Sequence, residues 1–268
     1  MGAGIAHALL LAGAHVQVCD ADQERVDRGL AQIRTMVQVS ADRGTLSEDV
    51  PAVTGRLSGN VGVAGIGGDL VIEAVPEIPA LKAEILAGIE EAVGPHALVA
   101  SNTSSISIDH LAGPLAHPER FLGMHFFNPV PASLLVEVVV GTRTAPDAVA
   151  RAQAAAEAIG KTAIVVRDSP GFASSRLGNL LGLEAIRMLQ EGVASAEDID
   201  RAMTLGYKHP MGPLRLSDLV GLDVRLGVAE YLAQALGPRY EPPALLREMV
   251  ARGDLGKKTG RGFYTWED

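Results

Sequence analysis

Two ionisable residues lie in apolar stretches of the chain, where a charge is costly. His125 belongs to the run from Phe121 to Phe126, and Glu137 interrupts the Leu and Val residues from 134 to 140. A buried carboxylate needs a partner, so we expect one for Glu137. A histidine held by a carboxylate can remove the hydroxyl proton of a secondary alcohol while a hydride leaves the same carbon. Each residue could equally be an ordinary core or strand-edge side chain.

The first twenty residues carry part of a dinucleotide-binding pattern. Gly2 and Gly4 open an expected helix, and Asp20 ends the short strand that follows it. The full pattern is Gly-x-Gly-x-x-Gly after a strand, with an acidic residue about 20 positions later. A carboxylate at Asp20 would accept the ribose hydroxyls and repel a 2′-phosphate, which favours NAD over NADP. An ordinary helix and strand with a surface aspartate is the alternative.

If this pattern is real, the strand before the first helix and the first two glycines are missing from it. We therefore expect a sheet that lacks its usual central strand and a chain that, as written, binds NAD poorly. A misassigned start or a shortened chain would explain the incomplete pattern.

The order of the remaining patterns indicates two domains. Strand and helix patterns alternate up to about residue 168, and from Gly171 to about Val250 every apolar segment has helical spacing. This change predicts a Rossmann-type, doubly wound parallel sheet in residues 1–168, without its first strand, and a smaller all-helical domain in residues 169–268. The expected strands are 15–19, 69–75, 97–100, 121–126, 134–140 and 163–166, and the expected helices of the first domain are 2–11, 21–43, 80–93 and 146–159.

Composition limits the partners and the compartment. The chain has 268 residues, 47% of them hydrophobic, which is enough for a sizeable core. Its net charge of −9 offers no general attraction to nucleic acid or to an anionic membrane. The single cysteine, Cys19, excludes an intrachain disulfide and a cysteine metal cluster. No apolar run approaches the roughly 20 residues that span a bilayer, so we expect a cytoplasmic protein. We also expect no metal site.

Six segments together resemble the short-chain L-3-hydroxyacyl-CoA dehydrogenases. They occur in the order and at the spacing of that family, over essentially the whole chain. The segments are Ser101–Ser105, Met124–Pro131, Leu135–Val139, Asp168–Phe172, His209–Pro213 and Lys257–Tyr264.

The resemblance implies reversible, NAD-dependent oxidation of an L-3-hydroxyacyl-CoA, such as 3-hydroxybutyryl-CoA, to the 3-oxoacyl-CoA. It assigns His125 as the general base and Glu137 as the carboxylate that orients it. By the same resemblance, Ser104 donates a hydrogen bond to the substrate oxygen, and Asn102 lies near the nicotinamide end of NAD. The acyl-CoA and NAD are expected to bind between the two domains.

The resemblance also places Glu77 and Lys82 along the cofactor, although a solvated first helical turn is the alternative. For the phosphates of coenzyme A it implies contacts from the long helix after Asp20, where Arg34 and Arg43 are the basic candidates. Either arginine could be just a solvated helix charge. The helical domain is the expected surface of a homodimer.

The sequence departs from the family pattern after Pro170-Gly171-Phe172. Ser175 precedes Arg176 where relatives have asparagine, and Asn179 follows Ser175 by one helical turn. Ser175 can still donate a hydrogen bond to a thioester or keto oxygen, but it reaches less far than an amide. Asn179 could substitute or be a packing residue. Leu134 also stands where many relatives have lysine.

Two other function classes remain open on the sequence alone. A dehydrogenase of free hydroxy acids or sugar acids, of the gulonate type, would share the His–Glu pair and NAD without needing a site for coenzyme A. A crystallin-like protein would keep the fold and bind NAD without turnover, and a shortened chain could be an inactive fragment.

Overall fold

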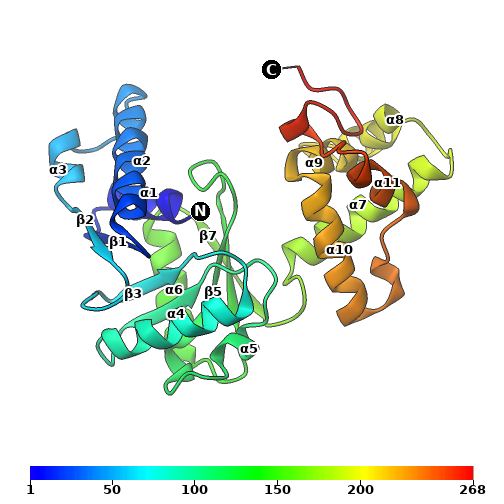
Figure 1. Ribbon diagram of the computed structural model, residues 1–268. Helices are drawn as coiled ribbons and strands as arrows, with labels where there is room; N and C mark the ends of the chain where they lie inside the picture. The colour runs from blue at the N-terminus through cyan, green and yellow to red at the C-terminus, as the bar shows by residue number, and fades with distance from the viewer. Residues whose placement is uncertain (268) are drawn as a thin grey trace. The chain divides into compact units, whose positions relative to one another are not determined.

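The computed structural model describes residues 1–267, and the chain forms two compact units. The first unit comprises Met1–Ser169 and the second begins at Pro170. Each unit has a hydrophobic core of its own. In Figure 1 the first unit runs from blue to green and the second from green to red.

Helices and strands alternate in the first unit, as expected for a Rossmann-type fold (Figure 1). Its strands are β1 (Val16–Asp20), β2 (Leu57–Val61), β3 (Leu70–Glu73), β4 (Leu98–Ser101), β5 (Phe121–Phe126), β6 (Leu135–Val140) and β7 (Thr162–Arg167). Its helices are α1 (Gly2–Leu11), α2 (Gln23–Asp42), α3 (Val50–Thr54), α4 (Pro79–Ala92), α5 (Ile108–Ala112), the 3₁₀ turn η1 (Pro118–Arg120) and α6 (Pro146–Ala158). The predicted fold class is therefore confirmed for this unit.

The strands form two separate ladders. Five strands follow the order β3-β4-β5-β6-β7, and β1 and β2 form a parallel pair of their own. Among residues 1–267 no strand joins this pair to β3. This arrangement agrees with the expectation of a sheet without its central strand.

The five-stranded sheet is not wholly parallel, which corrects the sequence prediction. Strands β3, β4 and β5 are parallel neighbours, but β6 is antiparallel to β5, and β7 is parallel to β6. The reason lies in the connections. A parallel pair needs a crossover of about a dozen residues or more, whereas residues 127–134 are only eight residues between β5 and β6. The chain must therefore turn back directly.

The core explains which way His125 points. One core cluster packs the even-numbered residues of β5 against alanines of α6: Leu122, Met124, Phe126, Ala148, Ala152 and Ala156. Successive residues of a strand face opposite sides of the sheet. Gly123 lies on the side of α5, because a Cβ atom at Gly123 would come within 2.9 Å of Ile108. His125 shares that side with Gly123.

The second unit is helical, as predicted. Its elements are α7 (Ser174–Gln190), α8 (Ala196–Arg201), the π-helical turn η2 (Ala202–Gly206), α9 (Pro213–Val220), α10 (Leu222–Leu236), η3 (Pro238–Tyr240), α11 (Ala244–Ala251) and η4 (Lys257–Thr259). Over residues 1–267, no helix of either unit is long and apolar enough to cross a membrane.

A buried aspartate fastens the last segment of the chain to α9. Asp218 accepts hydrogen bonds from the backbone N–H groups of Phe263 and Tyr264 and from Nε1 of Trp266, each at 2.9 Å. Gly262 is required beside it, because a Cβ atom there would lie 2.1 Å from Oδ1 of Asp218. One carboxylate therefore orders residues that are distant in the sequence.

We expect Asp218→Ala to lower the free energy of unfolding of the protein by about 3 kcal/mol or more. The substitution leaves three donors without their acceptor, and hydrogen bonds to a charged group contribute about 1.5–3 kcal/mol each. Urea denaturation followed by far-UV circular dichroism measures the change. The exposed Glu191, exchanged for alanine, serves as the control and should leave the midpoint unchanged. Equal midpoints for both variants would contradict this role of Asp218.

Candidate active site

His125 and Glu137 form a buried pair across two strands. They are directly opposite in the antiparallel register of β5 and β6, and Nδ1 of His125 lies 2.7 Å from Oε2 of Glu137. His125 is 6% exposed and Glu137 is 0% exposed. The buried partner expected for Glu137 is therefore His125.

This geometry fixes the protonation pattern of the imidazole. Glu137 accepts a hydrogen bond, so the hydrogen of the neutral ring belongs on Nδ1 and the basic lone pair on Nε2. The ring of Phe127 packs beside it, with ring centroids 4.6 Å apart and an interplanar angle of 46°. A carboxylate on one side and an aromatic ring on another hold the imidazole in one orientation.

The loop between β5 and β6 is held by a buried lysine. The ammonium of Lys161 donates to the carbonyl oxygens of Val130, at 2.7 Å, and Ser133. Burial lowers the pKa of Lys161 below its ordinary value. Leu134, at the end of this loop, is 71% exposed. The position at which the resemblance implies a lysine is thus occupied by a solvent-facing apolar side chain.

Ser104 lies in a loop that is organised by one carboxylate. Oε1 of Glu77 accepts hydrogen bonds from the hydroxyl of Thr103 at 2.5 Å and from the backbone N–H groups of Ser104 at 2.9 Å and Ser105 at 3.1 Å. The hydroxyl of Ser104 lies 3.4 Å from the same oxygen. Glu77 therefore fixes the loop that carries the predicted substrate contact.

Asn102 joins this loop to the strand of His125. Its side-chain oxygen accepts a hydrogen bond of 2.9 Å from the backbone N–H of Phe126, the residue after His125. Its own backbone N–H donates to the carbonyl oxygen of Glu73 at 2.8 Å. Asn102 thus holds the carboxyl ends of β3, β4 and β5 together, close to the imidazole.

The stability that Glu77 contributes to the protein should be lost in acid. Its burial acts to raise the pKa, but hydrogen bonds from Thr103 and Ser104 and the charge of Lys82 outweigh burial, so the pKa of Glu77 lies below its ordinary value. A lowered folded-state pKa stabilises the protein above the unfolded-state pKa, about 4.3. That stability is lost as the pH falls through the folded-state value.

We therefore expect the thermal midpoint of Glu77→Gln to depend less on pH in acid than that of the wild-type protein. The difference in thermal midpoint between the two should be constant above about pH 5 and should shrink below about pH 4. Differential scanning fluorimetry over a pH series that extends above and below both values checks the prediction. A difference that does not change with pH would show that the charge of Glu77 contributes nothing to folding.

Lys82 has a different environment from the one the resemblance implies. Its ammonium donates to Oε1 of Glu73 at 2.7 Å and to the carbonyl oxygen of Val75 at 3.1 Å, and it lies 3.3 Å from Oε2 of Glu77. Its side chain is 1% exposed. The three ammonium hydrogens thus have three protein acceptors, and a direct contact with a cofactor stays only a prediction.

Sequence reasoning missed Glu73. This residue is the only charged one in the apolar strand β3, and its side chain is fully buried. The signal was the same as for Glu137, a lone carboxylate in an apolar strand.

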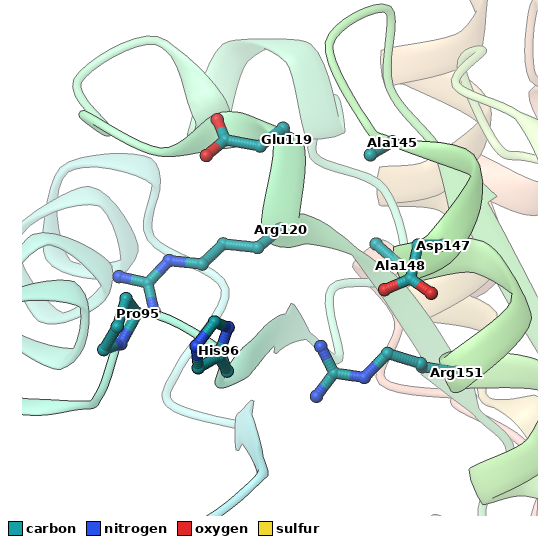
Figure 2. A pocket seen from close by; sticks show the side chains of 8 residues that line it. All are labelled: Pro95, His96, Glu119, Arg120, Ala145, Asp147, Ala148 and Arg151. Atoms are coloured by element: carbon teal, nitrogen blue, oxygen red, sulfur yellow. The ribbon is translucent and has the colours of Figure 1, made fainter.

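A cavity of about 170 Å³ lies at the amino ends of β4 and β5 (Figure 2). It is lined by Pro95, His96, Glu119, Arg120, Ala145, Asp147, Ala148 and Arg151. These residues precede β4 and β5 or begin α6, whereas Asn102 and His125 lie at the carboxyl ends of β4 and β5. The cavity is therefore separate from the His125 site.

Two family models together match nearly the whole chain. The model described as "3-hydroxyacyl-CoA dehydrogenase, NAD binding domain" matches residues 1–169, and the model of the C-terminal domain of the same enzymes matches residues 171–266. The chain belongs to the 3-hydroxyacyl-CoA dehydrogenase family. The family predicted from the six segments is thereby confirmed.

Individual relatives agree with this membership. The chain is 42% identical to a probable 3-hydroxybutyryl-CoA dehydrogenase of Bacillus subtilis, over 100% of this chain and 94% of the relative. It is 41% identical to the 3-hydroxybutyryl-CoA dehydrogenase of Mycobacterium tuberculosis, over 99% and 95%. The crystal structure of the (S)-3-hydroxybutyryl-CoA dehydrogenase of Ralstonia eutropha superposes with a TM-score of 0.94 at 42% identity, covering 100% of this chain and 96% of that one.

NAD is the cofactor of this family, and the beginning of the first unit carries part of a dinucleotide site. Helix α1 starts at Gly2 without a side-chain cap, and the N–H of Gly4 donates to the carbonyl oxygen of Met1. The N–H groups of Gly2 and Ala3 are therefore the candidates for contact with a pyrophosphate. Gly4 permits close packing, because a Cβ atom there would lie 3.0 Å from Val130. Asp20 ends β1 with an exposed carboxylate, as a ribose contact requires.

Two further predicted residues belong to the helical unit. Ser175 lies in the first turn of α7, and its carbonyl oxygen accepts a hydrogen bond of 2.9 Å from the side-chain amide of Asn179. Asn179 is buried and uses this donor within its own helix. That Asn179 takes the place of the asparagine implied by the resemblance stays a prediction.

The arginines proposed for coenzyme A both lie exposed on α2 or at its end. Arg43 lies nine positions after Arg34, which is about two and a half turns at 3.6 residues per turn. The two side chains leave the helix on opposite sides. A single phosphate can therefore be met by one of them, not by both.

Proposed function

We propose that this protein catalyses the reversible, NAD-dependent oxidation of an L-3-hydroxyacyl-CoA, such as 3-hydroxybutyryl-CoA, to the 3-oxoacyl-CoA. The observation that carries the proposal is the buried pair of His125 and Glu137, 2.7 Å apart across β5 and β6. Membership of the 3-hydroxyacyl-CoA dehydrogenase family supports the same reaction.

In the oxidation, Nε2 of His125 takes the proton of the 3-hydroxyl group while the C–H bond at that carbon breaks and the C=O bond forms. Bound NAD⁺ supplies the acceptor for the hydride. The imidazole becomes positive, and the buried carboxylate of Glu137 stabilises this charge at 2.7 Å. Burial excludes water, so the carboxylate is screened little.

In the reduction, protonated His125 returns the proton to the 3-oxo oxygen. We propose that the hydroxyl of Ser104 donates a second hydrogen bond to that oxygen and that Ser175 contacts the thioester or keto group. The loop of Ser104 is preorganised by its three hydrogen bonds to Glu77, which favours this role.

The substrate class can be tested with one pair of compounds. The rate of NADH oxidation is measured with acetoacetyl-CoA and with free acetoacetate at equal concentration. We expect turnover of the thioester only. Faster turnover of the free acid would favour a hydroxy-acid dehydrogenase, and NADH binding without turnover of either would favour a binding protein.

We also propose that the protein is a homodimer formed through its helical unit. Large apolar side chains of this unit are exposed, among them Leu177 at 67%, Leu205 at 77% and Tyr207 at 76%. Apolar area of this kind favours burial against another protein surface. Sedimentation velocity is expected to give twice the chain mass of 27.9 kDa, and a monomer at micromolar concentration would refute the dimer.

A further inference from the structure

Glu73 is the centre of a buried network at the carboxyl end of β3. Oε1 accepts hydrogen bonds from the ammonium of Lys82 at 2.7 Å and from the backbone N–H of Val75 at 2.6 Å, and Oε2 accepts one from the hydroxyl of Ser101 at 2.6 Å. The side chains of Glu73 and Lys82 are 0% and 1% exposed. Nothing in the reaction described above uses this carboxylate directly.

We propose that Glu73 is a positioning residue of the active site, which fixes the loop of Asn102 and Ser104 through Lys82 and Ser101. The effects on turnover that this inference predicts rest on the proposed function. It assigns Lys82 a role through Glu77 in place of a direct cofactor contact.

The first connection runs through Lys82. Its ammonium lies between two carboxylates, 2.7 Å from Glu73 and 3.3 Å from Glu77. Glu77 in turn accepts the backbone N–H groups of Ser104 and Ser105. Charge-assisted hydrogen bonds in a buried site are strong and directional. The position of Lys82 therefore sets the position of Glu77, and Glu77 sets that of Ser104.

The second connection runs through Ser101 and the backbone. The hydroxyl of Ser101, held by Glu73, accepts the backbone N–H of Thr103 at 3.2 Å. The carbonyl oxygen of Glu73 accepts the backbone N–H of Asn102, which also binds the strand of His125. Both connections begin at Glu73 and converge on the loop of residues 102–105. Removing the charge of the Glu73 side chain should loosen that loop.

The decisive variant is Glu73→Gln, which keeps the size of the side chain and can still accept one hydrogen bond. We expect kcat with acetoacetyl-CoA to fall roughly ten- to a hundredfold, the range for a misplaced active-site group, while KM for acetoacetyl-CoA changes much less. Glu91→Gln is the matched control, because Glu91 is exposed on the same helix as Lys82. It should leave kcat unchanged.

A readout without substrate or cofactor separates positioning from catalysis. Hydrogen exchange followed by mass spectrometry reports the amides of Ser104 and Ser105, both donors to Glu77. We expect these amides to exchange faster in Glu73→Gln than in the wild-type protein. Slow exchange as in the wild-type protein would overturn the proposal whatever happens to kcat.

A double variant, Glu73→Gln with Lys82→Met, tests whether the effect is merely one of stability. The single substitution leaves the buried ammonium of Lys82 with one carboxylate, Glu77, in place of two. The double variant removes both buried charges and should regain part of the lost thermal stability. Positioning predicts that kcat stays low and the loop still exchanges fast at a temperature where every variant is folded. Recovery of wild-type kcat and exchange in the double variant would overturn the proposal.

These outcomes are distinct from failure of the proposed function. No turnover of acetoacetyl-CoA by the wild-type protein would defeat the proposed reaction, and hydrogen exchange would still decide the role of Glu73.

Discussion

Replacing His125 by alanine is expected to lower kcat for acetoacetyl-CoA reduction by roughly two to four orders of magnitude. Removal of a positioned general acid or base costs this much, and the pairing of Nδ1 with Glu137 leaves Nε2 as the ring atom suited to transfer the proton. KM should change far less, because a proton is transferred only in the transition state. Initial rates of NADH oxidation measure both constants.

The control for this substitution is His110→Ala, since His110 is an exposed histidine on α5 of the same unit. It should keep the wild-type rate. A loss of less than tenfold in His125→Ala, with the variant folded, would mean that another group transfers the proton.

The exchange Glu137→Gln is expected to lower kcat by roughly a hundredfold or more. Glutamine has nearly the same shape and can accept a hydrogen bond from Nδ1, so the fold should be retained. It lacks the charge that stabilises the imidazolium at 2.7 Å. It can also turn its amide hydrogens toward the ring and favour the wrong tautomer. Steady-state kinetics beside a circular dichroism spectrum separates loss of activity from loss of fold.

Glu157→Gln is a suitable control for Glu137→Gln, because Glu157 is exposed on α6. Its kcat should equal that of the wild-type protein. Nearly full activity of Glu137→Gln would mean that hydrogen bonding alone, without charge, orients His125.

The fold was largely predictable because the apolar periodicity of each segment is strong. The alternation of strands and helices up to β7 and the purely helical segments after Gly171 correspond to the structure. The predicted parallel sheet holds for β3 to β5, whereas β6 and β7 run in the opposite direction, because periodicity does not report direction. The short connection of residues 127–134 contained that information.

The site was predictable only in part. The cost of burying a carboxylate pointed to a partner for Glu137, and the structure supplies His125. The same reasoning applied to Glu73 would have predicted a buried partner, which in the structure is Lys82. The identity of each partner depends on the register of strands and on the path of loops, which come from tertiary packing. One sequence does not specify them.

Residues assigned by resemblance differ in how well their surroundings suit the assigned role. Asn102 and Ser104 lie in one ordered loop beside the strand of His125. Lys82 is instead enclosed by protein acceptors. A role carried over from relatives describes a position, whereas the contacts of a side chain depend on its neighbours in this chain. The contact of Lys82 with Glu73 is the clearest example.

The most direct test of the central claim is the oxidation itself. The purified protein is mixed with L-3-hydroxybutyryl-CoA and NAD⁺, and NADH is followed by its absorbance while the CoA product is identified by mass spectrometry. The account predicts NADH and acetoacetyl-CoA in equal amounts, and a rate that falls to near background in His125→Ala. Absence of NADH from the folded wild-type protein, with both compounds present at saturating concentration, would contradict it.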